Sequence, residues 1–399
     1  METGGGLSAM NAFDRRLKIT LFVVLALGLA ARIFLAARFY GTGDVHIWEY
    51  FTSFWTEGKS PYESAFYNYG PFWYWIISLM GALSRSTGLA FSFLIKWPLI
   101  LADLAIFSAV LAGAGRLSGD RRAAVYAASV FFLNPVSVLL TGYHGSFDNL
   151  SLLFVLLGWY AFTFYSISQR TFLGALFFAL GVCFKHFNVM LAPVFAFRQK
   201  GLLGKLAVLL AAPLLFGLLV LPYYLSNPAA VKEGLFGWSL HGGYWGWSGV
   251  ICRSMLFFTG IDLIQKPWFK LLDHFNDFLY LAIFFASIHW ARRRDLLDGI
   301  LLVFLMFYAL TTQIAPQYTL WIVPFAALRP NRYFIAYSVA GGAQVAAFLY
   351  CHYHWYNHVP FVGTLSNLAS PAFVLMRYLT WGVCVLWFFS LARRSQTTP

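Results

Sequence analysis

Long apolar runs separated by short, mostly basic segments repeat along the whole chain. Crossing the hydrocarbon core of a bilayer takes about 20 helical residues, and the first run, 19–39, meets that length. Because it is longer than a signal-peptide core and no small-residue cleavage site follows it, we interpret it as a retained helix. The pattern predicts an all-α, polytopic membrane protein of about 12 transmembrane helices, at 19–39, 93–113, 123–142, 149–168, 171–184, 186–197, 206–224, 274–291, 296–312, 317–328, 333–351 and 371–391.

The basic residues between these runs indicate the orientation of the chain. Lys and Arg concentrate in cytoplasmic loops of membrane proteins, and all the basic clusters fall on one side if both termini are cytoplasmic. The external loops are then about 40–90, 225–273 and 352–367. The clusters are Arg15/Arg16/Lys18, Arg116/Arg121/Arg122, Arg170, Arg198/Lys200/Lys205, Arg292/Arg293/Arg294, Arg329/Arg332 and Arg393/Arg394.

The apolar stretch 71–85 is not counted as a transmembrane span. One more span before Arg116/Arg121/Arg122 would place that basic cluster on the outside. Its Trp and Tyr residues favour the headgroup level of a bilayer. We therefore expect interfacial helices in the first external loop. Prolines near the ends of several runs indicate broken or kinked helices, at Pro193, Pro222, Pro316 and Pro324.

Composition supports a single membrane domain over residues 1–399. The chain is 60% hydrophobic and 11% charged, whereas soluble domains are about 25% charged. The net charge of +13 comes from loop residues that form no continuous basic face, so no nucleic-acid partner is expected and membrane lipids are. The four cysteines lack metal-ligand spacing and are interpreted as packing residues, at Cys183, Cys252, Cys351 and Cys384.

Uncommon polar residues gather at the external ends of the predicted helices. The cytoplasmic loops contain no Gly-Lys-Ser/Thr phosphate-binding loop, so any chemistry is expected on the outer face. The external residues are Asp44, His46, Glu49, His144, Asp148, Lys185, His186, His241, Arg253, Gln317, His352, His354 and His358.

Asp44 follows the first span in the segment GTGDVHIWEY. A carboxylate at the mouth of a cavity is suited to take a proton from an attacking hydroxyl, and the alternative is an acid that caps the following helix. The spacing Asp44-x-His46-x-x-Glu49 also invites a metal-site interpretation. No further acid nearby completes a shell for a hard cation, and neither a metal nor another cofactor is expected.

His144 and Asp148 are four residues apart in TGYHGSFDNL and would share one face of a continuous helix. They are predicted to bind substrate hydroxyls or to orient the base. Alternatively, Asp148 caps the helix that begins near residue 149.

Lys185 and His186 interrupt an otherwise almost wholly apolar stretch. Ionisable groups at such depth are expensive and are candidates for function, and a cation there suits a lipid phosphate. A lysine that snorkels to the headgroups is the alternative. Three further ionisable residues lie inside predicted spans, and we expect them to pair with one another because buried charges need partners: Lys96, Asp103 and Arg377.

Arg253 and His241 belong to SLHGGYWGWSGVICR, a Gly- and Trp-rich external segment. Aromatic faces stack on sugars and Gly allows close backbone approach, although Trp-rich segments also serve as interfacial anchors. His352 begins the cluster HYHWYNH, which we interpret as a polar rim because no acid or cysteine accompanies it.

Several of these segments together resemble the GT-C superfamily, integral-membrane glycosyltransferases that use polyprenyl- or dolichyl-phosphate sugars, and within it a prokaryotic mannosyltransferase-like group. The order of the motifs carries the resemblance, from about residue 44 to 325. They are Asp44 after the first span, Gly58-Lys-Ser-Pro-Tyr62, Tyr67-Asn-Tyr-Gly-Pro71, GSFD in place of GQFD, Gly181-Val-Cys-Phe-Lys185, and APQYTLWIVPF.

The resemblance implies roles for individual residues. Asp44 matches the catalytic base, Lys185 falls where the family places a cation, and Gln317 and Tyr318 fall at an outer cavity wall. His144 and Ser146 depart from plainer family members. No second acid adjoins Asp44, which argues against the metal-dependent branch that transfers whole oligosaccharides.

The leading hypothesis is an inverting glycosyltransferase that moves one mannose-like hexose or pentose from a polyprenyl-phosphate donor to a glycan, glycolipid or other acceptor hydroxyl on the outer face. The donor phosphate would contact Lys185, His186 and Arg253. A secondary transporter or lipid flippase would also show broken helices and buried ions, but its polar groups usually lie near the midplane and its sequence shows repeats. A purely structural subunit leaves Asp44 and the one-sided histidines unexplained. The residues predicted to bind substrate are His144, Asp148, His241, Gln317, Tyr318 and His352.

Overall fold

The computed structural model describes residues 4–237, 246–312, 314–356 and 371–393, and within these ranges the chain is all-helical with no strand. The all-α prediction is confirmed. The α-helices are α1 (Gly4–Arg38), α2 (Gly43–Thr56), α3 (Pro71–Thr87), α4 (Phe91–Leu94), α5 (Trp97–Ser118), α6 (Arg121–Phe132), α7 (Pro135–Leu139), α8 (Asp148–Phe164), α9 (Ile167–Phe184), α10 (Ala192–Ala196), α11 (Leu202–Ser226), α12 (Pro228–Phe236), α13 (Gly246–Thr259), α14 (Leu271–Arg293), α15 (Leu296–Leu310), α16 (Val323–Ala327), α17 (Arg332–Tyr356) and α18 (Pro371–Arg393).

Short non-α turns connect several of these helices. Five are 3₁₀ turns and one, η2, is a π turn. Two of the turns and two short α-helices lie within the segment 225–273, and its position outside the membrane stays a prediction. The turns are η1 (Pro61–Glu63), η2 (Leu140–His144), η3 (His186–Leu191), η4 (Leu263–Gln265), η5 (Pro267–Lys270) and η6 (Pro316–Leu320).

Proline and glycine mark many of the helix boundaries. Proline suits the first turn of a helix, where a backbone N–H has no partner, and it begins α3, α7 and η6. The predicted breaks at Pro193, Pro316 and Pro324 coincide with the starts of α10, η6 and α16, whereas Pro222 lies inside α11. The α5 helix ends at Gly119, whose φ of 67° favours glycine.

Five of the described helices are long and apolar enough to cross a membrane, or six if the pair 121–132 and 135–144, bent by 40°, is one span. Four shorter apolar helices accompany them. The chain thus has the helical, membrane-spanning character that its sequence indicated, and twelve crossings stay a prediction. The five long helices are Arg15–Arg38, Phe91–Ser118, Leu202–Ser226, Arg332–Tyr353 and Leu375–Arg393.

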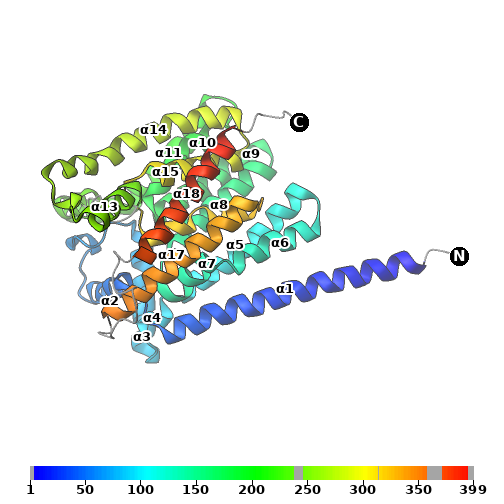
Figure 1. The fold of residues 1–399 in the computed structure, drawn as a ribbon, viewed down its shortest axis with the longest axis horizontal. Coiled ribbons are helices and arrows are strands. Elements are labelled where there is room, and N and C mark those ends of the chain that lie inside the picture. Colours follow the sequence, from blue (N-terminus) through cyan, green and yellow to red (C-terminus); the bar gives the residue numbers. More distant parts are fainter. Residues whose placement is uncertain (1–3, 238–245, 313, 357–370, 394–399) are drawn as a thin grey trace.

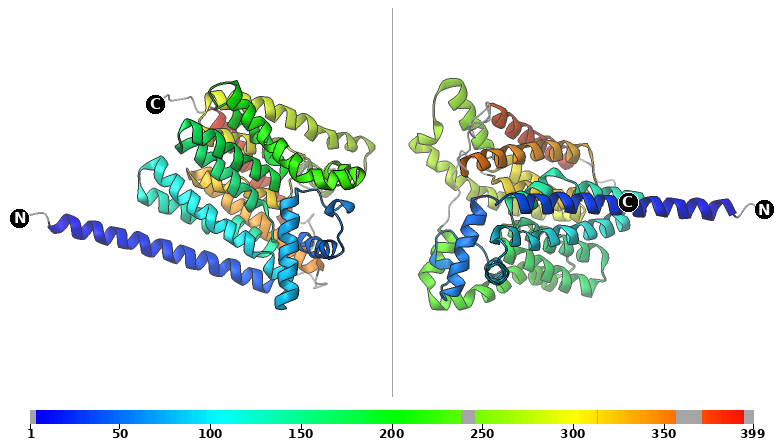
Figure 2. Two further views of the ribbon diagram at one scale, coloured as in Figure 1. Left: turned by 180° about the vertical axis from the view of Figure 1, so that it is seen from behind. Right: turned by 90° about the horizontal axis from the view of Figure 1, so that it is seen from below.

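The helices form a bundle with two distinct ends (Figure 1). The N-terminal end of α1, the α5–α6 connection and the C-terminal end of α18 lie toward one end, and α2 lies at the other. At that other end α2 and α3 run across the direction of α1 (Figure 2), as expected for interfacial helices. The segment 40–90 and the basic connections therefore lie at opposite ends of the molecule.

The helices of the segment 40–90 have an aromatic core of their own. The buried side chains of α2, η1 and α3 pack with residues from the start of α5 and from α11 and α12. Phe147 joins this cluster from the main bundle, and its ring stacks on that of Trp73 with centroids 4.3 Å apart. The loop is thus packed against the residue that precedes the N-terminus of α8.

The bundle contains a fully buried ion pair between Arg32 of α1 and Asp103 of α5, with Nε and Oδ2 2.7 Å apart. The expectation that Asp103 pairs with Lys96 or Arg377 is therefore wrong. Lys96 instead donates to the backbone carbonyl of Phe39 at 2.6 Å, which its position at the start of α5 allows. The true partner of Asp103 lies 71 residues away, and no local sequence spacing points to it.

Three further side chains donate hydrogen bonds to the Asp103 carboxylate. The hydroxyls of Ser137 and Thr141 donate to Oδ2 at 3.0 and 2.8 Å, and the Asn149 amide donates to Oδ1 at 2.9 Å. These residues belong to α7, η2 and α8. A buried charge is tolerated when it is paired and its remaining lone pairs are satisfied, so this network holds α5, α7, η2 and α8 against α1.

We predict that Asp103→Asn lowers the free energy of unfolding by about 3–5 kcal/mol, because Arg32 is left as an uncompensated buried charge. Adding Arg32→Met should recover a large part of the loss. The control is Asp120→Asn, since Asp120 is exposed and caps α6, and Asn caps equally well. Thermal unfolding of the purified variants in detergent measures the effect. An Asp103→Asn protein as stable as the control would contradict it.

Candidate active site

Side chains from five parts of the chain meet at the end of the bundle that carries α2. They come from the first turn of α2, the connection between η2 and α8, the break after α9, turn η6 and the C-terminal part of α17. Most of the residues predicted to form a site lie here, and the structure brings together Asp44, His144, Asp148, Lys185, Tyr318 and His352.

Asp44 lies in the first turn of α2 and is half-buried. Thr42 is the N-cap residue, and neither it nor Asp44 makes a side-chain capping hydrogen bond. The capping alternative for Asp44 is therefore wrong. Among the described residues, the Asp44 carboxylate accepts no hydrogen bond and forms no ion pair. This acid is free to accept a proton or a hydrogen bond from a ligand.

The surroundings of Asp44 raise its pKa above the ordinary value of 3.8. Burial is the largest cause, because it disfavours the charged carboxylate. Lys185 acts in the opposite direction, Asp148 adds to the increase, and His352 lowers the pKa again. A carboxylate with a raised pKa is a stronger base than a free aspartate, which is the property that general-base catalysis requires.

His352 holds the N-terminus of α2. The backbone N–H of Gly43 donates to its Nε2 at 2.9 Å, which satisfies one of the N–H groups that a helix start leaves without a partner. An accepting Nε2 places the proton of the neutral imidazole on Nδ1. His144 approaches the same turn, with its Nδ1 3.4 Å from the hydroxyl of Thr42. Both histidines thus position the residues beside Asp44.

His144 and Asp148 do not lie on one continuous helix, so the shared face that such a helix would give them does not form. The π turn η2 ends at His144, and Gly145 follows with φ of 82°, a conformation that favours glycine. The α8 helix then begins at Asp148. Its N-cap residue is Phe147, and no side chain forms a capping hydrogen bond there. Asp148 does not cap the helix either, because its carboxylate is bound elsewhere.

Asp148 forms a buried ion pair with Lys185, with Nζ and Oδ2 2.6 Å apart. The hydroxyl of Ser146 donates to the same oxygen at 2.5 Å, and the indole N–H of Trp321 donates to Oδ1 at 2.6 Å. The lysine is 4% exposed and the aspartate 0%. Lys185 therefore does not snorkel to the surface, and its charge is retained inside the site by Asp148.

Lys185 occupies a break in the helical backbone, as its sequence context predicted. The α9 helix ends one residue before it, Lys185 is extended with φ of −146°, and η3 begins one residue after it. Its ammonium lies among four aromatic rings, with Nζ 5.0 to 5.9 Å from the centroids of Tyr69, Phe147, Phe187 and Tyr318. Such rings attract a cation through their faces.

Two residues of the site, Tyr69 and Trp321, were missed as individual predictions. Tyr69 lies near Asp44 and Asp148, whose charges add to the burial that raises its pKa. The next residue, Gly70, lies so close to α9 that a Cβ would be 2.0 Å from the carbonyl oxygen of Cys183. The quoted motifs YNYGP and PQYTLW contain both residues, so the signal was present in the sequence.

The other residues predicted from the sequence either lie near the Asp44–Lys185 site or fall outside the described part of the chain. Gln317 and Tyr318 belong to η6 and are half-buried, whereas the His186 side chain is exposed. Arg253 lies on α13, but its side chain is outside the described part of the chain, and so is His241. Their predicted contacts with donor and substrate stay predictions.

The Asp44, His46 and Glu49 side chains do not converge. Glu49 accepts a hydrogen bond from the Tyr40 hydroxyl, and the His46 ring stacks on the Tyr40 ring with centroids 4.0 Å apart. Within the described residues, no group of three or more His, Cys, Asp or Glu side chains is arranged to hold a metal ion. The polar groups of this site are those of an acid, a cation and aromatic residues.

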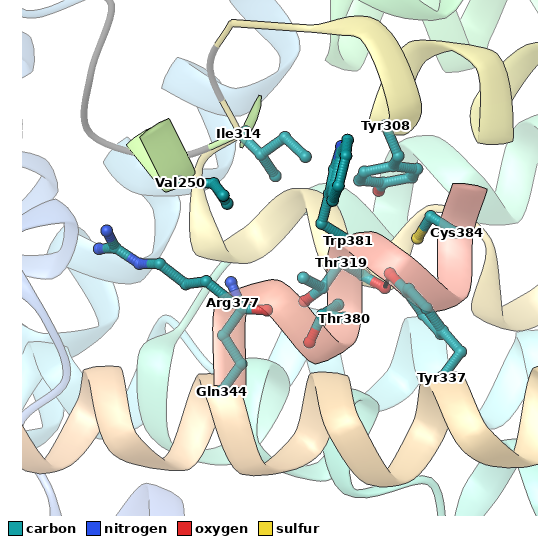
Figure 3. A pocket seen from close by; sticks show the side chains of 11 residues that line it. Val250, Tyr308, Ile314, Thr319, Tyr337, Gln344, Arg377, Thr380, Trp381 and Cys384 are labelled. Carbon is teal, nitrogen blue, oxygen red and sulfur yellow. Dashed lines mark hydrogen bonds between the residues drawn. The ribbon is translucent and has the colours of Figure 1, made fainter. Parts of the chain in front are cut away.

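A small cavity of about 20 Å³ lies between η6, α13, α15, α17 and α18 (Figure 3). Thr319 of η6 and Arg377 of α18 are among its lining residues. A single water fills such a volume. Arg377 thus lines this cavity instead of pairing with Asp103.

No protein-family model matches the sequence, and no curated protein is similar to it. Among solved structures the chain is similar to ArnT from Cupriavidus metallidurans, which was crystallised bound to undecaprenyl phosphate. The two are 14% identical, the match covers 93% of this chain and 77% of that chain, and the TM-score is 0.50. The match shows that the chain shares the fold of this structure, which agrees with the fold that the sequence motifs indicated.

Proposed function

We propose that the chain is an inverting glycosyltransferase that transfers one sugar from a polyprenyl-phosphate donor to an acceptor hydroxyl. The observation that carries the proposal is Asp44, a carboxylate that accepts a hydrogen bond from none of the described residues, placed beside the buried Asp148–Lys185 pair. The fold supports it, since ArnT, which shares it, was crystallised with undecaprenyl phosphate.

In the proposed reaction Asp44 takes the proton of the acceptor hydroxyl while that oxygen attacks the anomeric carbon. The bond from this carbon to the phosphate oxygen breaks, and the lipid phosphate leaves with the electron pair. Attack opposite the leaving group inverts the configuration of the sugar. Phosphate is a good leaving group, so the protein mainly has to position both substrates and stabilise charge.

Lys185 is the proposed ligand of the donor phosphate. A lysine ammonium has three N–H donors, and Asp148 is the one described residue that accepts a hydrogen bond from it. The ion pair holds the ammonium in one place, while its other N–H groups remain for phosphate oxygens. Asp148 therefore acts by positioning the lysine.

The surrounding residues are proposed to bind the sugar and the acceptor. Tyr69, Tyr318 and Gln317 offer aromatic faces and polar groups next to the acid, as sugars require. His186, His241 and Arg253 complete the proposed set at the donor. A mannose-like hexose or a pentose is the proposed sugar, and a glycan or glycolipid is the proposed acceptor.

The site is proposed to face the outside of the cell membrane, with both termini cytoplasmic. The basic connections lie at the end of the bundle opposite α2, and the positive-inside rule places such connections in the cytoplasm. A prokaryotic inner membrane fits this arrangement, because a lipid-phosphate donor presents its sugar at the membrane surface.

We predict that Asp44→Asn lowers turnover by at least about 100-fold, the usual scale for loss of a general base, with little change in stability. The matched control is Glu49→Gln, which makes the same change in an exposed acid of the same helix and should keep activity. Both are assayed by release of free lipid phosphate from short-chain polyprenyl-phosphate sugars with a glycolipid acceptor.

Activity of the Asp44→Asn protein within a few-fold of the parent would show that another group is the base. A transporter or flippase would move the donor between leaflets of a vesicle without consuming it. Donor that stays intact with the parent protein across a panel of sugars and acceptors would therefore contradict the transferase itself.

The pH dependence of kcat/KM should report the same carboxylate. Because the ionised form is the base, kcat/KM should fall roughly tenfold per pH unit below the pKa of Asp44. Since burial raises that pKa, the midpoint should lie above 3.8. The residual activity of Asp44→Asn should lack this limb, and a parent profile that is flat down to pH 4 would contradict the assignment.

Lys185→Met should destabilise the protein by about 3–5 kcal/mol, because Asp148 becomes an unpaired buried charge. The double variant Lys185→Met/Asp148→Asn removes both charges and should recover stability while donor affinity stays at least tenfold weaker. Donor affinity equal to that of the parent would exclude Lys185 as the phosphate ligand.

A further inference from the structure

A second cavity, of about 340 Å³, lies among the basic connections of the bundle. Its walls come from the ends of α5 and α8, the start of α9, the α10–α11 connection, the start of α15 and the residue after the α16 C-cap. Its volume is within the range of small-molecule sites. The polar and charged residues that matter for its chemistry are Arg170, Arg198, Gln199, Lys200, Asp295 and Arg329.

The lining carries excess positive charge. Arg329 forms ion pairs with Asp295 and, at 3.6 Å, with Asp298. Among the described residues, Arg170, Arg198 and Lys200 form no ion pair. Burial lowers the pKa of the Arg198 guanidinium, and the charge of Asp295 only partly opposes this effect. Four cations therefore border a cavity with a single acid, Asp295, which is already engaged by Arg329.

Several buried N–H donors of the same residues have no acceptor. Within the described part of the chain, these are Arg170 Nε, Arg198 Nε and Nη2, and Gln199 Nε2. Gln199 is 6% exposed. Its Oε1 accepts from the Thr171 hydroxyl at 2.9 Å, which fixes the side chain and leaves the amide N–H₂ without a partner. Buried donors without an acceptor are rare in native proteins and need an explanation.

We propose that this cavity binds a phosphate-bearing anion. Phosphate oxygens accept from guanidinium forks and amide N–H groups in charge-assisted hydrogen bonds, and they supply the negative charge that the lining lacks. The headgroup of an anionic phospholipid and a free polyphosphate share this chemistry. The site lies at the opposite end of the bundle from Asp44 and does not depend on the proposed transferase reaction.

The test measures the stability and ligand content of the full-length protein in two arms. The soluble arm adds inorganic pyrophosphate to protein in neutral detergent and follows the melting temperature. The lipid arm compares nanodiscs of phosphatidylglycerol with nanodiscs of phosphatidylcholine and counts retained lipids by native mass spectrometry. The variant is Arg198→Gln, and the matched control is Arg293→Gln, an exposed arginine of the same end that does not line the cavity.

We expect binding in one arm, with at least tenfold weaker affinity in Arg198→Gln and parental affinity in Arg293→Gln. Pyrophosphate binding assigns the site to a free polyphosphate, and retention of phosphatidylglycerol alone assigns it to a lipid headgroup. Binding in neither arm overturns the proposal. Equal weakening in both variants also overturns it, because diffuse surface charge would then account for the affinity.

A second variant keeps the test independent of the folding of Arg198→Gln. Gln199→Glu retains the oxygen that accepts from Thr171 and replaces the unpartnered amide by a carboxylate oxygen. The proposal predicts a folded protein whose anion affinity falls at least tenfold. Parental affinity in this variant would place the anion outside the cavity.

Discussion

The arrangement of the bundle depends on the neutralisation of buried charge in Arg32 and Asp103. Neither side chain has access to water, and in such surroundings an ionised group persists only with a partner and with its lone pairs satisfied. Asp103 obtains both from α1, α7, η2 and α8. Thr141 and Asn149 flank His144 and Asp148 in the sequence. The network therefore also holds in place the backbone segment that carries these two residues of the candidate site.

Three aspartates in this region differ in the number of hydrogen bonds that their carboxylates accept. The number distinguishes the two carboxylates with a structural role from the one that is available for catalysis. Asp103 accepts from four side chains, and Asp148 accepts from three. Asp44 accepts from no described residue although burial raises its pKa. A carboxylate that already accepts three or four hydrogen bonds has little capacity left for a substrate, whereas the Asp44 carboxylate accepts none from the described residues. This argument does not rely on similarity to other proteins.

The sequence predicted the helices well and their pairings poorly. Apolar runs define helices through local periodicity, so the break at Lys185 and the prolines that begin α10 and α16 were found. The partner of Asp103 is 71 residues away and that of Lys185 is 37, and only the tertiary fold determines them. For the same reason the capping roles considered for Asp44 and Asp148 were wrong: both acids begin helices, but their carboxylates face other elements.

The residues that converge on the candidate site lie at interruptions of helices. His144 ends a π turn, Lys185 is extended between two helical segments, and Tyr318 belongs to a 3₁₀ turn. Irregular backbone within a membrane protein is tolerated only where it is buried in protein or lines a polar cavity. A regular helix would hold its polar groups along one stripe, whereas interruptions at the same end of several helices bring groups from distant segments to one place. Because these helix breaks lie at the same end of the bundle, a chain with few charged residues brings an acid, a cation and several aromatic side chains into one site.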